Sequence, residues 1–64
     1  MKKEKNAVFE RAVGVFENLD VATDWFNSPA IALDGKTPAQ SSETTEGAIE
    51  VLNLLGRIEQ GIFS

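Results

Sequence analysis

The last third of the chain, from Thr44 to Ser64, has the pattern of one helix with a signal at each end. Thr44 is a suitable N-cap, because its hydroxyl oxygen can accept a hydrogen bond from a free N–H of the first turn. Gly61 is a suitable end, because glycine readily adopts the left-handed conformation of a C-terminal cap. Two large apolar residues, Ile62 and Phe63, follow that predicted end. We expect them either to fold back on the core or to contact a partner.

The apolar residues of this predicted helix form a broad arc. Those that share one face at helical spacing, and are expected in the core, are Ala48, Val51, Leu52, Leu55 and Ile58. Ile49 and Leu54 lie outside this face, so the arc is wider than a three-helix domain needs. Surplus apolar surface of this kind favours self-association, for which a symmetric dimer is the commonest arrangement.

Residues 4–18 also have helical spacing. Their apolar stripe is formed by Phe9, Ala12, Val13 and Phe16 and is widened by Val8 and Val15. We interpret Gly14 as a point where a neighbouring helix packs closely. A second, short helix is predicted to begin at Asp20 as its cap and to end at Asn27-Ser28-Pro29, because the residue before a proline is disfavoured in the α region. Its predicted inner face holds Ala22, Trp25 and Phe26.

The segment from Pro29 to Gly35 is predicted to be a loop that ends in an Asp34-Gly35 turn. Its apolar residues are Ile31, Ala32 and Leu33, and we expect them to anchor the loop to the core. Thr37 to Gln40 has the pattern of a helix start, with a threonine cap, a proline at the first position and a glutamine that completes a capping box. No strand-like alternation occurs. The prediction is an all-α fold, a small helical bundle of three main helices plus a short helical turn.

Length and charge narrow the class of protein. Sixty-four residues make one domain near the lower size limit, where only about 60% of the unfolded surface becomes buried. The net charge of −4 argues against nucleic acid as a partner, because phosphate binding requires clustered Lys and Arg. No apolar run approaches the ~20 residues that span a bilayer. We therefore predict a soluble, cytoplasmic protein that binds neither nucleic acid nor membrane by itself.

The residues for catalysis are scarce. The chain has no His, Cys or Tyr, so the usual general base, thiol nucleophile and phenolic acid are missing. Glu43, Glu46 and Glu50 share one helix face, where they would serve either as acid, base or metal ligands or simply as a solvated helix start favoured by the dipole. Gly35-Lys36-Thr37 lacks the upstream glycine of a phosphate-binding loop. We predict no catalytic residue, no cofactor and no metal.

A series of landmarks, with their spacing intact, carries a resemblance to a known family. The landmarks are Trp25-Phe26, Pro29, Ala32-Leu33, Gly35-Lys36-Thr37-Pro38, Thr44, Gly47, Val51, Leu55-Gly56-Arg57-Ile58-Glu59 and Gly61-Ile62-Phe63-Ser64. This set resembles the C-terminal toxin-binding domain of Xre/MbcA/ParS-type antitoxins. The resemblance covers residues 7–64, which we expect to form the domain after a flexible basic N-terminus of residues 1–6.

The resemblance implies a partner and a mode of action. The expected partner is a RES-domain toxin that consumes NAD, and the antitoxin domain would block its NAD pocket without catalysis. The residues that the resemblance assigns to toxin binding are Leu54, Arg57, Ile58, Gly61, Ile62, Phe63 and Ser64. A secondary loop contact is assigned to Pro29, Leu33 and Gly35. Arg57 has an alternative role, because a cation near a helix end complements the dipole.

The chain also departs from the family pattern. Ala30-Ile31 replaces an Asn-Pro pair, and Ser41-Ser42 replaces two leucines, so we expect the short helix after Pro38 to be frayed or detached from the core. Family antitoxins usually carry an upstream helix-turn-helix domain, and only six residues precede the first helix predicted here. We predict that this chain does not bind an operator alone. Two rival functions stay open: another helical interaction module, such as a phage-type inhibitor, and a small enzyme using Glu46 or Glu50.

Overall fold

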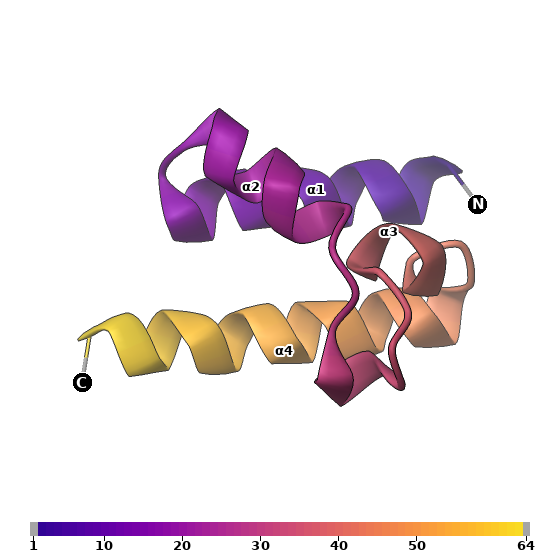
Figure 1. Ribbon diagram of the computed structural model, residues 1–64. Helices are drawn as coiled ribbons and strands as arrows, with labels where there is room; N and C mark the ends of the chain where they lie inside the picture. Colours follow the sequence, from indigo (N-terminus) through magenta and orange to yellow (C-terminus); the bar gives the residue numbers. More distant parts are fainter. Residues whose placement is uncertain (1, 64) are drawn as a thin grey trace.

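Four α-helices and one 3-10 turn make up the computed structural model, which describes the backbone of residues 2–63 and the side chains of residues 5–61. The elements are α1 (Lys2–Phe16), α2 (Leu19–Phe26), the 3-10 turn η1 (Ile31–Leu33), α3 (Pro38–Ser41) and α4 (Thr45–Phe63). The prediction of an all-α bundle with three main helices and a short helical turn is confirmed. In Figure 1, α1 and α4 run in the same direction, and α2 returns alongside α1. The loop between α2 and α3 crosses α4.

The longest helix sets the length of the molecule. α4 has 19 residues, which at 1.5 Å per residue amounts to about 28 Å, close to the 30 Å long axis of the protein. Its start is as predicted: the Thr44 hydroxyl accepts a hydrogen bond from the Gly47 N–H at 3.0 Å. Its end is not, because Gly61 keeps a helical backbone and the helix continues to Phe63.

The core lies between α1, α2 and α4. Its buried members are Val8, Ala12, Val15, Ala22, Phe26, Leu33, Ala48, Val51 and Leu55. Two aromatic pairs join α1 to α2, with ring centroids 5.2 Å apart for Phe9 and Phe26 and 5.6 Å apart for Phe16 and Trp25. Trp25 is therefore half-buried against the core. Ion pairs at the rim join Arg11 to Glu59 at 2.7 Å and Lys5 to Glu43 at 3.6 Å.

The apolar faces of α1 and α4 are turned slightly from their predicted directions. On α1 the most buried residues are Val8, Ala12 and Val15, the edge of the predicted stripe, while Phe9, Val13 and Phe16 are half-buried around them. On α4 the predicted core residue Leu52 is 39% exposed, while Ile58 and Leu54 are half-buried against the core. A helix buries only the arc that its neighbours cover, and on α4 this arc is centred on Ala48, Val51 and Leu55, so Leu52 lies at its edge.

Two further expectations about the N-terminal half are wrong. The cap of α2 is Asn18, whose side chain accepts a hydrogen bond from the Val21 N–H at 3.0 Å, whereas Asp20 lies inside the first turn. Gly14 faces open space, with nothing within 4 Å of an added Cβ, so no helix packs closely on it. α1 begins at Lys2, two residues before the start of the predicted helical spacing.

The short helix α3 is firmly held. Thr37 caps it in a complete capping box, because its hydroxyl accepts the Gln40 N–H and the Gln40 side chain accepts the Thr37 N–H, each at 3.0 Å. Ser42 is fully buried, and its hydroxyl donates to the Pro38 carbonyl at 2.7 Å. The expectation of a frayed or detached helix is therefore wrong. A serine can replace a larger apolar residue there because its hydroxyl finds an acceptor inside its own turn.

Candidate functional site: a pocket between η1 and α4

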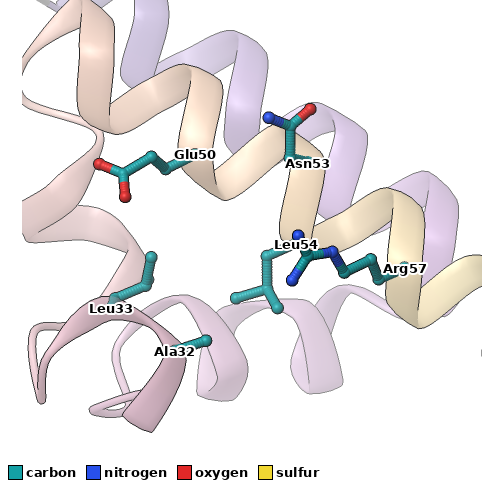
Figure 2. A pocket seen from close by; sticks show the side chains of 6 residues that line it. All are labelled: Ala32, Leu33, Glu50, Asn53, Leu54 and Arg57. Atoms are coloured by element: carbon teal, nitrogen blue, oxygen red, sulfur yellow. The ribbon is translucent and has the colours of Figure 1, made fainter.

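A pocket of about 200 Å³ opens where the η1 loop meets the middle of α4. Its lining residues are Ala32, Leu33, Glu50, Asn53, Leu54 and Arg57. In Figure 2, the Leu54 side chain extends from α4 toward Ala32 and Leu33 of the loop, and α4 also supplies the polar residues Glu50, Asn53 and Arg57. Three of the residues that the resemblance assigned, Leu33, Leu54 and Arg57, therefore meet at one place.

The η1 loop is held in place by its own backbone. The Ala30 N–H donates to the Lys36 carbonyl and the Gly35 N–H donates to the Ala30 carbonyl, each at 3.0 Å. Asp34 and Gly35 adopt positive φ angles of 59° and 82°, as the predicted Asp-Gly turn requires. Leu33 anchors the loop to the core, as expected.

Ile31 does not anchor the loop. Its side chain is 98% exposed, although we expected it to pack on the core. A 3-10 turn of three residues directs its side chains to different sides, so only one of them, Leu33, points inward. The loop thereby presents an aliphatic side chain to solvent directly before the pocket residue Ala32.

Arg57 has an unusual position for the only cation of α4. The helix dipole acts on charges in the last turn of a helix. Because α4 continues to Phe63, Arg57 lies before that last turn. The alternative role of Arg57, to complement the dipole at the helix end, is therefore not supported. Among the side chains of residues 5–61, its guanidinium makes no hydrogen bond or ion pair, whereas Lys5 and Arg11 each pair with a carboxylate.

The α4 side of the pocket carries a negative charge at one end, Glu50, and a positive charge at the other, Arg57. Glu50 precedes Arg57 by seven residues, which is two helical turns or about 10 Å along the axis, too far for the two to pair directly. Asn53 lies between them. The three share one face because their spacing follows the helical repeat. That spacing was readable in the sequence, but we had grouped Glu50 with the upstream glutamates and had not singled out Asn53 or Ala32 as contact residues.

The other assigned residues lie elsewhere. Ile58 is half-buried against the core, and Gly61 is exposed near the end of α4. Pro29 and Gly35 are exposed on the loop and do not line the pocket. The side chains of Ile62 and Phe63, and all of Ser64, lie outside the described residues.

No group of three or more metal-ligating side chains occurs within residues 5–61, and Glu43, Glu46 and Glu50 do not form one. None of the described helices is both long and apolar enough to traverse a bilayer. Within the described residues, the molecule is a small helical bundle with a partly polar pocket, and the exposed Ile31 directly precedes the pocket residue Ala32.

Comparison with known proteins identifies the family. The model of the antitoxin Xre/MbcA/ParS C-terminal toxin-binding domain matches residues 11–61, so the chain belongs to this family. It is 41% identical over 58 residues to an antitoxin Xre of Photorhabdus laumondii and 38% identical over 58 residues to one of Yersinia enterocolitica. Each match covers 89% of this chain and 39% of the relative, so the chain spans about two fifths of their length. No solved structure matches the chain.

Proposed function

We propose that this chain is the toxin-binding module of an antitoxin and that it neutralises a RES-domain toxin by covering its NAD pocket. The observation that carries the proposal is the match of residues 11–61 to a family of toxin-binding domains. The RES identity of the toxin and the blocked NAD pocket rest on the resemblance described above. Neutralisation takes place in the cytoplasm and involves no catalysis by this chain.

The proposed contact surface follows the second half of α4. Leu54, Arg57, Ile58 and Gly61 belong to it, and the chain continues through Ile62, Phe63 and Ser64 toward the toxin's pocket. The η1 loop supplies the secondary contact through Pro29, Leu33 and Gly35. This assignment is supported by the pocket, because Leu33, Leu54 and Arg57 come together there from two separate segments.

Inhibition by occlusion sets a requirement on affinity. An inhibitor that does not destroy its target must occupy it almost completely, which for a lethal enzyme means nanomolar binding or tighter, about −12 kcal/mol. Affinity of this size comes from a few well-placed anchors, among which Arg and aromatic residues are common. Arg57 has the unpaired charge for such a role within the described side chains.

Co-expression with the product of the neighbouring gene tests the proposal. The expected result is that the toxin alone arrests growth and lowers cellular NAD, that the chain binds it in a pull-down, and that NAD recovers. A neighbour that is harmless or does not bind would contradict the proposal and favour the alternative, a helical module or phage-type inhibitor with another partner. Retained inhibition by a chain carrying Glu50→Gln would speak against the enzyme alternative.

A homodimer stays a second prediction, and the structure changes the residues on which it rests. Leu54 packs against the core, whereas Ile49 and Leu52 are 54% and 39% exposed on the outer side of α4. Sedimentation equilibrium of the wild type and of Leu52→Lys tests it. We expect a dimer that the lysine variant converts to a monomer.

A further inference from the structure

Beside the pocket, the η1 loop and α4 present a surface whose chemistry specifies what can bind there. We define the η1–α4 surface as Ile31 and Ala32 of the loop together with Asn53 and Arg57 of the helix. It extends the contacts assigned above, because Ile31, Ala32 and Asn53 are not among them.

The first component is Ile31. Single exposed aliphatic residues are common on protein surfaces and by themselves require no explanation. Ile31 differs because it is almost fully exposed on a short turn closed by backbone hydrogen bonds: the Leu33 N–H donates to the Ala30 carbonyl at 3.0 Å and the Asp34 N–H to the Ile31 carbonyl at 3.1 Å. A side chain held on an ordered backbone loses little conformational entropy on binding, so more of its burial contributes to affinity.

The second component is Arg57, a cation that lines the same pocket as Ala32, the residue next to Ile31 in η1. The guanidinium of Arg57 is exposed, lines the pocket and has no acidic partner among the side chains of residues 5–61. A guanidinium binds a carboxylate through two parallel N–H···O bonds, and Asn53 adds a neutral polar side chain to the same pocket lining. Glu50, two turns away at the other end of the pocket, disfavours a second acid and so fixes the end at which the carboxylate enters.

The size of the pocket is compatible with a single side chain of a protein partner. Its volume of about 200 Å³ is below the roughly 300–1,000 Å³ of small-molecule and cofactor sites. The apolar lining residues Leu33 and Leu54 suit the methylene groups of a glutamate or the flank of an aspartate. The protein has a net charge of −4, so most of its surface repels an acidic group. Arg57 therefore attracts an acidic group of a partner to one place and orients the partner there.

We propose that the η1–α4 surface binds a protein partner that presents a carboxylate side chain to Arg57 and an apolar hollow to Ile31. The inference rests on the proposed function, since it takes this partner to be the toxin. The inference adds two groups that the toxin must present to this surface, a carboxylate and an apolar hollow. This surface is separate from the C-terminal segment that would enter the NAD pocket.

Two variants and two matched controls test the inference with the co-purified RES-domain protein as the probe. Ile31→Ser removes the exposed aliphatic group, and Leu19→Ser is its control, because Leu19 is 60% exposed on α2. Arg57→Gln removes the pocket cation, and Lys36→Gln removes an equal charge outside the pocket. Dissociation constants are measured by biolayer interferometry at low and high salt, and thermal unfolding of each variant verifies its fold.

We expect each test variant to weaken binding at least tenfold, and each control to change it less than threefold. Arg57→Gln should also flatten the salt dependence that the wild type shows, because a charged contact is screened by ions. Both test residues are exposed, so the melting temperatures should stay close to the wild type.

The outcomes separate this inference from the proposed function. If the wild type binds the toxin and both variants bind equally well, the η1–α4 surface is not the interface, and the proposed function stands. If the wild type does not bind, both proposals fail. If inorganic phosphate or ADP binds the chain alone and Arg57→Gln abolishes that binding, the pocket is an anion site and the inference of a protein carboxylate is overturned.

Discussion

Replacing Gly47 by alanine is expected to destabilise the protein, because Gly47 is buried where the first turn of α4 meets the end of α3. A Cβ added there would overlap the Ser41 carbonyl oxygen and lie 2.7 Å from the Ser41 carbonyl carbon and 2.9 Å from Thr44 Oγ1. Two of these three atoms belong to the backbone. Relief therefore requires the whole turn between α3 and α4 to shift, which a rotamer change alone cannot provide.

Three terms determine the size of the effect. Overpacking costs about 1–3 kcal/mol. Displacing Thr44, whose hydroxyl caps the helix by accepting the Gly47 N–H, costs about 1 kcal/mol more. The higher helix propensity of alanine offsets about 1 kcal/mol, which leaves a net loss of roughly 1–3 kcal/mol. For a domain of this size, the melting temperature should fall by roughly 4–8 °C for each kcal/mol lost. The loss is large relative to the net stability, because a core of this size provides only about 3–5 kcal/mol.

Thermal unfolding followed by circular dichroism measures this effect against two matched variants, Gly14→Ala and Gly56→Ala. Both glycines lie within helices, and an added Cβ meets nothing within 4 Å at either. Each control should therefore gain about 0.5–1 kcal/mol from the more restricted alanine backbone. The reasoning is refuted if Gly47→Ala melts at or above the wild-type temperature, as the controls should.

Three further predictions concern the cap of α2, the buried serine and the end of the chain. Asn18→Ala should lower the free energy of unfolding by about 1 kcal/mol, and Asp20→Ala by about half as much, in urea titrations; the reverse order would contradict the observed cap. Ser42→Ala should cost about 1 kcal/mol in the same assay, because the Pro38 carbonyl then keeps only the Ser42 backbone donor. Deleting Ile62 to Ser64 should abolish neutralisation in the NAD assay while the melting temperature is kept; a lower melting temperature with full neutralisation would indicate a structural tail.

Local signals in the sequence predicted the starts of α3 and α4 correctly, although they placed the cap of α2 at Asp20 instead of Asn18. The caps at Thr37 and Thr44 and the turn at Asp34-Gly35 are confirmed, because each depends on hydrogen bonds or dihedral angles within a few residues. The fold class followed from the helical spacing of the apolar residues in the same way. The end of α4 was predicted less well, since a glycine permits a helix to end without requiring it, and Gly61 stays helical.

Features that depend on the packing of separate segments were harder to predict. The apolar character of Ile31 and Leu52 suggested burial, but which side of η1 or α4 faces the core is decided by the neighbouring elements. The same holds for the glycines. We expected close packing at Gly14, but it is Gly47 that packs closely, against the backbone of Ser41. The pocket combines residues more than fifteen positions apart, so the sequence alone could not bring Leu33 to Arg57.

The extension of α4 past Gly61 changes the interpretation of Arg57. If α4 ended at Gly61, the positive charge of Arg57 would lie in the last turn and would stabilise the helix end by about 0.3–1 kcal/mol. With the helix ending at Phe63, the dipole gives it no such role, and no carboxylate among residues 5–61 pairs with it. The chain thus keeps a cation in the lining of the pocket, without an internal partner for it among the described side chains. A contribution to binding then accounts for Arg57 better than a contribution to stability, and Arg57→Gln separates the two by lowering affinity without lowering the melting temperature.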